Sequence, residues 1–212
     1  MTSPTLRTLA LVLAAALTMV PAAALARAAP PPLQGDMTLG DPKAKVTVVE
    51  YASASCPHCA RFNNNVFPEF KKAYIDTGKV HYVFREFLTS PVEVAAAAFL
   101  LARCAGDKQY FGVLDDFFHG QQHAYETGDV RSLIYSTGAK AGLSQDKINA
   151  CLSDQASLKA LDERVTRNQK ADAVNSTPTF VIDGAKLPES DHEVNLQDLN
   201  AAIQPLLAAR RR

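Results

Sequence analysis

Residues 46–60, VTVVEYASASCPHCA, decide the fold of this 212-residue chain. The stretch opens with an apolar, β-branched run of the kind that forms a strand buried on both faces. Small residues follow, and then the motif Cys56-Pro57-His58-Cys59. Beyond the motif, apolar residues recur at steps of three and four, which predicts a helix. The pattern therefore places the two cysteines where a buried strand gives way to a helix.

The Cys-x-x-Cys spacing fits either a redox pair or half of a zinc site. A Cys₄ zinc site needs a second close pair of cysteines, and Cys104 and Cys151 lie far apart in the sequence. At a helix start, unpaired N–H groups and the positive dipole end favour a thiolate and lower the pKa of Cys56. Pro57 fixes the first helical φ, and His58 can add positive charge. The motif therefore favours the redox pair.

The rest of the chain predicts three further strands, the last two of them close together, and a long helical block. Gly78 is expected to end the first helix, which Pro68 should kink, and Ser90 to cap the helix after the next strand. The expected strands are 80–87, 179–183 and 185–188, and the expected helices are 94–102, 107–123, 129–140, 144–153, 155–172 and 195–209. The opening strand at 46–51 and the strand at 80–87 should be parallel, and the strands at 179–183 and 185–188 antiparallel.

Two motifs more than a hundred residues apart carry a family resemblance. Residues 50–59, EYASASCPHC, resemble the active-site segment of DsbA-type disulfide oxidoreductases, and residues 176–180, STPTF, resemble the cis-proline loop of thioredoxin-fold proteins. The resemblance covers residues 40–208. It implies an α/β thioredoxin fold with an inserted all-helical domain, a periplasmic location, and oxidation of cysteines in exported proteins.

The resemblance also implies roles for individual residues. Cys56 would form the mixed disulfide with a substrate, and Cys59 would be the leaving thiolate. Thr177 and Pro178 would present backbone groups to an extended substrate strand. Glu50 would be a buried acid that exchanges a proton with Cys59; the alternative is a strand-end glutamate turned to solvent. The expected partners are reduced exported proteins and a membrane quinone-linked reoxidase, without a cofactor.

The N-terminus reads as a secretory signal peptide. Arg7 precedes an apolar run, residues 9–20, and small-x-small cleavage signals follow near Ala26. An uncleaved membrane anchor is the alternative, although the run is short for a span. The expected division is a signal peptide at 1–26, a flexible lead-in at 27–39, the two halves of the thioredoxin fold at 40–88 and 174–208, a helical insertion at 89–173 and a tail at 209–212.

Cys104 and Cys151 both fall in the helical block. Four cysteines allow three pairings, and the two outside the motif most simply pair in an oxidising compartment. A subset of DsbA-like proteins resembles this chain in having a second disulfide here. We expect a structural crosslink worth roughly 2–4 kcal/mol. The alternative is that the bridge tunes the active site.

Charge and histidine positions exclude several other functions. The 22 basic and 22 acidic residues balance, which leaves no electrostatic footprint for nucleic acid. His119 and His123 have the spacing of helical metal ligands but lack the accompanying carboxylate, so we expect solvated histidines and no metal. A monomer is expected.

Two other functions stay open from the sequence. One is a disulfide isomerase or reductase, because a threonine before the proline also occurs in isomerase-type relatives. Those relatives carry an extra N-terminal dimerisation domain, for which residues 27–39 are too short. The other is a non-catalytic thiol-dependent chaperone or metal-binding module, which retention of both motif cysteines disfavours.

Overall fold

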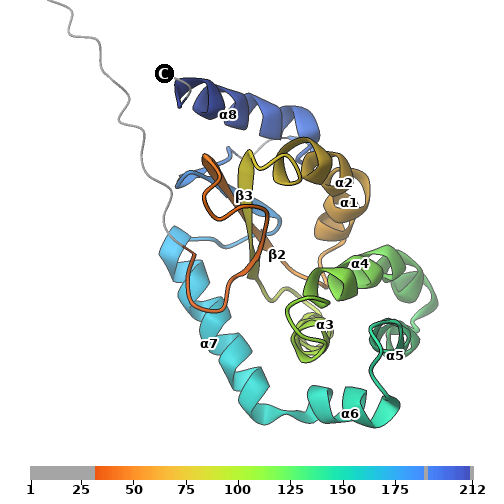
Figure 1. Ribbon diagram of the computed structural model, residues 1–212. Coiled ribbons are helices and arrows are strands. Elements are labelled where there is room, and N and C mark those ends of the chain that lie inside the picture. The colour runs from red at the N-terminus through yellow and green to blue at the C-terminus, as the bar shows by residue number, and fades with distance from the viewer. Residues whose placement is uncertain (1–31, 189–190, 211–212) are drawn as a thin grey trace, which may run out of the picture.

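The computed structural model describes residues 32–188 and 191–210, so the expected signal peptide lies outside the described residues. Strands and helices alternate at first, a run of helices follows, and the chain closes with two strands and a helix (Figure 1). The elements are β1 (Met37–Leu39), β2 (Val46–Ala52), α1 (Pro57–Asn65), α2 (Phe67–Phe70), the π-helical η1 (Lys71–Ile75), β3 (Val80–Glu86), α3 (Val92–Cys104), α4 (Tyr110–Thr127), α5 (Val130–Lys140), α6 (Gln145–Ser153), α7 (Gln155–Asp172), β4 (Thr179–Ile182), β5 (Ala185–Lys186) and α8 (Leu196–Ala209).

A five-stranded sheet in the order β1-β3-β2-β4-β5 forms the centre of the molecule. β2 and β3 are parallel, whereas β4 runs antiparallel to β2 and β5 antiparallel to β4. The predicted strand directions are therefore confirmed. β2 and β4 are neighbours although the whole helical block separates them in the sequence, because the chain returns to the sheet through α7.

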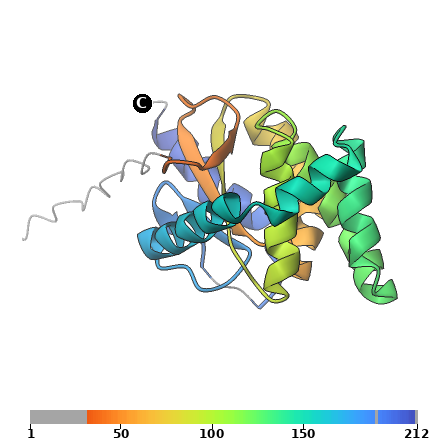
Figure 2. The ribbon, with the colours of Figure 1, turned by 90° about the horizontal axis from the view of Figure 1, so that it is seen from below.

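The two faces of the sheet are covered by different helices (Figures 1 and 2). On one face, Val48 and Phe180 belong to the large core cluster that also contains residues of α1, α3, α4 and α8. On the other face, Val49 and Val181 belong to a smaller buried cluster, and α7 lies against β3. Successive strand residues alternate between the faces, so Glu50 points toward the face of α1 and Tyr51 toward that of α7.

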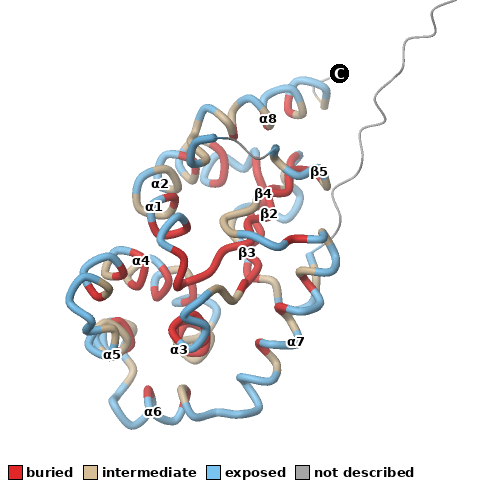
Figure 3. The backbone as a smooth tube through the Cα atoms, turned by 180° about the vertical axis from the view of Figure 1, so that it is seen from behind, coloured by how far each residue is buried: buried red, intermediate tan, exposed pale blue. Residues whose placement is uncertain are grey.

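Within the helical block, α3 and α4 pack on the side of the sheet that α1 covers. α4 contacts α1 and α3, and α3 in turn contacts α5, α6 and α7. Figure 3 shows that the inward sides of α3 and α4 are buried, whereas α6 is largely exposed and α5 is a mixture of exposed and partly buried residues. The insertion therefore supports the helix that carries the cysteine motif.

A disulfide joins Cys104, at the end of α3, to Cys151 in α6, with a Cα–Cα distance of 6.1 Å. Replacing both cysteines by alanine is expected to lower the free energy of unfolding by about 2–4 kcal/mol, because the crosslink restricts the unfolded chain. Urea unfolding of oxidised protein measures this. We expect the reduction potential of the Cys56/Cys59 pair to stay the same in this variant; a changed potential would indicate that the bridge tunes the site.

The N-terminal segment differs from the prediction for residues 27–39. Met37–Leu39 is not a flexible lead-in but an edge strand, β1, paired antiparallel with β3. The preceding residues are held by arginines from the helical block: Arg103 donates to the Gly35 carbonyl at 2.7 Å and Arg167 to the Gln34 carbonyl at 2.6 Å. The short strand depends on these tertiary contacts more than on its own sequence.

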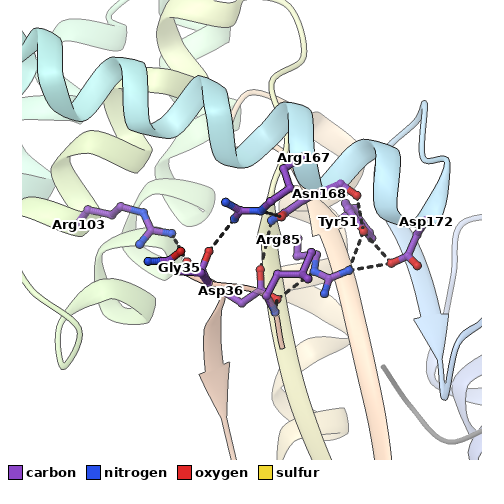
Figure 4. A network of polar contacts seen from close by, with 10 residues as sticks. Gly35, Asp36, Tyr51, Arg85, Arg103, Arg167, Asn168 and Asp172 are labelled. Atoms are coloured by element: carbon purple, nitrogen blue, oxygen red, sulfur yellow. Dashed lines mark hydrogen bonds and ion pairs between the residues drawn. The ribbon is translucent and has the colours of Figure 1, made fainter. Parts of the chain in front are cut away.

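Beneath this segment lies a buried ion-pair network (Figure 4), formed by Asp36, Tyr51, Arg85, Asn168 and Asp172. The Arg85 guanidinium donates to the carboxylates of Asp36 at 3.1 Å and Asp172 at 2.8 Å, and to the Tyr51 hydroxyl at 2.8 Å. The side chains of Arg85 and Asp36 are 2% and 0% exposed. The network thus ties the N-terminal segment, β3 and the end of α7 together.

One local prediction about the helices is confirmed in part and another is wrong. The helical segment after the motif is interrupted near Pro68, as expected: it is divided into α1, α2 and η1, with the break at Val66 and Pro68 in the first turn of α2. Ser90 does not cap α3. Pro91, in an extended conformation, occupies the cap position without a side-chain hydrogen bond. Gly78, with a φ of 68°, closes the turn after η1 in the left-handed conformation that favours glycine.

Candidate active site

Cys56 occupies the N-cap of α1, in an extended conformation with a φ of −82° and a ψ of 120°. Pro57 takes the first helical position, where its missing N–H costs no helical hydrogen bond. The Cys56 carbonyl accepts from the Ala60 N–H at 3.1 Å, which starts the helix. The side chain of Cys56 therefore faces the unpaired N–H groups of the first turn.

This environment favours the Cys56 thiolate. The pKa of Cys56 is lowered to about 5. A hydrogen bond from the Cys59 thiol is the largest cause; burial opposes it, and the Thr177 hydroxyl and the N–H groups of Cys59 and His58 add to the lowering. At neutral pH Cys56 is therefore a thiolate whenever the pair is reduced.

Cys59 has the opposite character. It is fully buried one turn into α1. Burial raises its pKa well above the usual value for a thiol, and the nearby charges of Cys56 and Glu50 raise it further. Both cysteines are free thiols in this structure. The two cysteines of the motif thus differ: the thiolate of Cys56 is stabilised, and that of Cys59 is destabilised. In thiol-disulfide exchange, this difference makes Cys56 the better leaving group.

The loop before β4 lies against the cysteine motif. The Thr177–Pro178 peptide bond is cis, and the Thr177 carbonyl lies 3.5 Å from Cys56 Sγ. The Thr177 hydroxyl is buried, and within residues 32–188 and 191–210 it has no hydrogen-bond partner of ordinary geometry. Its proximity to Cys56 is one of the causes that lower the pKa of that thiol. The structure therefore brings together the two motifs that the sequence singled out.

Glu50 is buried on the face of the sheet that α1 covers. Its exposure is 3%, so the alternative of a glutamate turned to solvent is not what the structure shows. Burial raises the pKa of Glu50 to about 8, a hydrogen bond from Tyr82 lowers it, and the Cys56 charge raises it. A carboxyl with such a pKa can both give and take a proton near neutral pH.

The backbone before Cys56 is fixed by the helical insertion. The side-chain amide of Gln121 in α4 donates to the Ala54 carbonyl at 2.5 Å, and the Tyr125 hydroxyl donates to the Ser55 carbonyl at 3.0 Å. The Ser55 hydroxyl donates to the Thr89 carbonyl at 2.9 Å. Sequence reasoning missed Gln121 and Tyr125, because their hydrogen bonds to this backbone form only where α4 packs against it.

His58, which the sequence singled out, lies in a group with Arg61 and Glu193 that the sequence did not predict. Its Nδ1 lies 2.7 Å from Glu193 Oε1, and the same carboxylate accepts from Arg61 Nε at 2.8 Å. Glu193 precedes α8 and lies 135 positions from His58 in the sequence. The three side chains are roughly half exposed. We call them the surface charge cluster.

Replacing Glu193 by glutamine is expected to raise the reduction potential of the motif slightly. The change removes a negative charge near Cys56 and frees Arg61, whose pKa the Cys56 charge already helps to raise. Because exposed ion pairs are worth about 0–1 kcal/mol, the rise should stay below about 20 mV. Equilibration with glutathione measures it. A fall in the potential would contradict this reading of the cluster.

A groove of about 790 Å³ runs beside the motif, between α1 and the cis-proline loop. His58 and Thr177 lie at its edge, together with the segment before α8. Its apolar lining includes Phe62, Val66, Val174, Leu187 and Val194. The groove can therefore receive an extended chain with apolar side chains next to Cys56.

The described residues offer few sites for other chemistry. In residues 32–188 and 191–210, no three His, Cys, Asp or Glu side chains lie together in a way that could hold a metal ion. No helix in this same part of the chain is long and apolar enough to cross a membrane.

Comparisons with known sequences match nearly the whole described region. A family model described as Thioredoxin matches residues 33–204. A Rickettsia bellii protein named "Putative protein-disulfide oxidoreductase" is 34% identical over 171 residues, which are 80% of this chain and 64% of that protein. A Rickettsia conorii protein of the same description is 38% identical over 152 residues, or 71% of this chain and 54% of that one. The chain thus spans less than two thirds of the length of these curated relatives.

Solved structures give the same picture. Wolbachia pipientis alpha-DsbA1 has a TM-score of 0.73 to this structure at 30% identity, with 84% of this chain and 94% of that one covered. Bacillus subtilis BdbD in its oxidised form has a TM-score of 0.67 at 21% identity, covering 85% and 97%, which shows a shared fold alone. The predicted thioredoxin fold with a helical insertion is confirmed.

Proposed function

This chain belongs to the DsbA-like family of thioredoxin-fold thiol-disulfide oxidoreductases, and from that premise we propose that it is an oxidase that introduces disulfide bonds into exported proteins in the periplasm. The observation that carries the proposal is the contrast within the motif. Cys56 has a pKa lowered to about 5, whereas burial raises the pKa of Cys59. A stabilised Cys56 thiolate stabilises the reduced form and makes the disulfide a stronger oxidant.

The reaction begins with the Cys56–Cys59 disulfide. A substrate thiolate, lying in the groove, attacks Cys56 Sγ, and Cys59 leaves with the electron pair of the broken bond. A second substrate thiolate then attacks the substrate sulfur of the mixed disulfide. Cys56 leaves readily because its thiolate is stable, and the substrate keeps the new disulfide. Backbone groups of Thr177 and Pro178 hold the substrate as an extended strand.

The reduced pair must then be reoxidised to complete the cycle. We propose a membrane quinone-linked reoxidase as the electron acceptor, in keeping with the family. A Bacillus subtilis protein named Disulfide bond formation protein D, 43% identical over 54 residues, supports a role in disulfide formation. That match covers 26% of this chain and 24% of that protein. Reduced exported proteins would be the substrates.

The reduction potential of the Cys56/Cys59 pair tests the proposal. A Cys56 pKa of about 5 lies about two units below that of thioredoxin, and each unit is worth about 30 mV, so we expect a potential of about −210 mV or higher. Protein with Cys104 and Cys151 replaced by serine isolates the pair. A value near about −270 mV, that of thioredoxin, would instead make the protein a reductant or isomerase.

A further inference from the structure

The buried carboxyl beneath the cysteine motif is bound by a residue that neither motif contains. Tyr82 lies on β3, beside β2, and its hydroxyl donates to Glu50 Oε2 at 2.6 Å. Tyr82 is 2% exposed and Glu50 3% exposed. The two side chains therefore meet inside the protein, on the face of the sheet that α1 covers.

Among the described residues, the groups with the strongest influence on this pair carry no positive charge. The strongest influences on the Glu50 carboxyl, besides its burial, are Tyr82 and Cys56. Those on Tyr82 are Glu50, Tyr110 from α4, and Cys59. A buried carboxylate needs an opposite charge or hydrogen bonds to offset the loss of water. Here the neutral hydroxyl of Tyr82 supplies that stabilisation.

The ring of Tyr82 is held independently of its hydroxyl. Its centroid lies 5.1 Å from that of Phe67, 6.3 Å from that of Phe70 and 6.2 Å from that of Phe111. Burial raises the pKa of Tyr82 well above its usual value, so the hydroxyl remains a donor at neutral pH. A phenylalanine at this position keeps the aromatic packing and removes the hydrogen bond alone.

We propose that Tyr82 is a positioning residue for proton transfer at Cys59: its hydroxyl holds the Glu50 carboxyl beneath the motif and stabilises the carboxylate whenever Glu50 has given its proton to Cys59. The inference rests on the proposed function insofar as it takes Cys56 and Cys59 as the redox pair.

The proton balance follows from the two directions of exchange. When a thiolate attacks Cys56 and the bond to Cys59 breaks, the electron pair stays on Cys59 Sγ. The Glu50 carboxyl gives its proton to that sulfur, the Tyr82 hydroxyl stabilises the resulting carboxylate, and solvent later returns a proton to Glu50. In the opposite direction, the Glu50 carboxylate takes the proton of Cys59, which then attacks a mixed disulfide at Cys56.

The reaction of reduced protein with the chromogenic disulfide dithiobis(nitrobenzoate) separates these steps. Cys56 displaces the first coloured thiolate, and Cys59 displaces the second. In Tyr82→Phe, the Glu50 carboxylate loses the hydrogen bond that the Tyr82 hydroxyl donates to it. The pH midpoint of the second phase should therefore rise by about one unit, and the rate of this phase at neutral pH should fall about tenfold. The pH profile of the first phase should stay near that of the unmodified protein.

Two further variants distinguish this role from a general loss of packing. Tyr110→Phe removes another buried hydroxyl, one that donates to Glu86 at 3.1 Å, and should leave the second-phase midpoint unchanged. In a Glu50→Gln background, Tyr82→Phe should have no further effect on the second phase. An unchanged midpoint in Tyr82→Phe, or the same shift in Tyr110→Phe, overturns the inference.

The failure of this inference and that of the proposed function give different results. A low reduction potential would remove the oxidase assignment but would leave the two-phase reaction and its pH dependence measurable. An unshifted second phase would remove the role of Tyr82 but would leave the potential of the pair as measured.

Discussion

Replacing Cys56 by serine is expected to lower the rate of substrate oxidation by more than about 10³-fold, because a hydroxyl can neither form the mixed disulfide nor leave as a stable anion. Replacing Cys59 by serine should have a different result. Cys56 still lies at the start of α1, where Thr177 and the N–H groups of the first turn help to lower its pKa, so it still exchanges with a disulfide, but the neighbour that would release the partner is gone. Covalent complexes at Cys56 should therefore accumulate.

Mass spectrometry of protein exposed to oxidised glutathione measures both outcomes. Cys59→Ser should carry one glutathione per chain, and Cys56→Ser none, since Cys59 is fully buried. The matched control replaces Cys104 and Cys151 by serine and should keep the activity of the unmodified protein. Stable glutathione adducts on Cys59 in the Cys56→Ser protein would show that the two cysteines have been assigned the wrong roles.

Replacing Arg85 by leucine is expected to lower the free energy of unfolding by about 3–5 kcal/mol, which is the usual cost of removing one partner from a buried ion pair. Arg85 faces two carboxylates, of which Asp36 is fully buried and Asp172 17% exposed. Without the guanidinium, both must stay charged without an opposite charge beside them or take up protons, although Asn168 and Tyr51 still donate to them. Urea unfolding at neutral pH measures the loss.

The control for this prediction also removes the two carboxylate charges that the loss of Arg85 would leave unpaired. The triple variant Asp36→Asn, Arg85→Leu, Asp172→Asn should recover a large part of the lost stability, because amides leave no uncompensated charge in the core. A single Arg85→Leu variant as stable as the unmodified protein would mean that water reaches the network. Since Asp172 ends α7, five residues before Thr177, the single variant should also loosen the cis-proline loop.

Most of the fold could be predicted because its signals are local. β-branched runs identified β2 and β3, and Gly78 marked the end of the helical segment before β3. The predicted strands 179–183 and 185–188 correspond to β4 and β5, which Asp183 and Gly184 join in a hairpin turn with φ values of 47° and 81°. β1 could not be found in this way. It has three residues, and it is held by arginines that come from the helical block.

The site residues also fall into those that local sequence patterns identify and those that only tertiary contacts place. The cysteine motif and Thr177–Pro178 are short sequence patterns with a known mechanical meaning, so the sequence was enough to single them out. Glu193 and Tyr82 carry no such pattern. Each acquires its place only when a partner far along the chain, His58 or Glu50, packs against it. Glu50 itself was expected from the family resemblance alone.

The disulfide between Cys104 and Cys151 has a consequence for how the chain is made. A ribosome or a translocation channel delivers the protein from its N-terminus, so Cys56 and Cys59 emerge first and Cys104 and Cys151 follow. If each newly exposed cysteine pairs with the unpaired one delivered just before it, the correct bonds form in order of arrival. Oxidation in that order would still need an outside electron acceptor, but it would leave no mispaired cysteines to reshuffle.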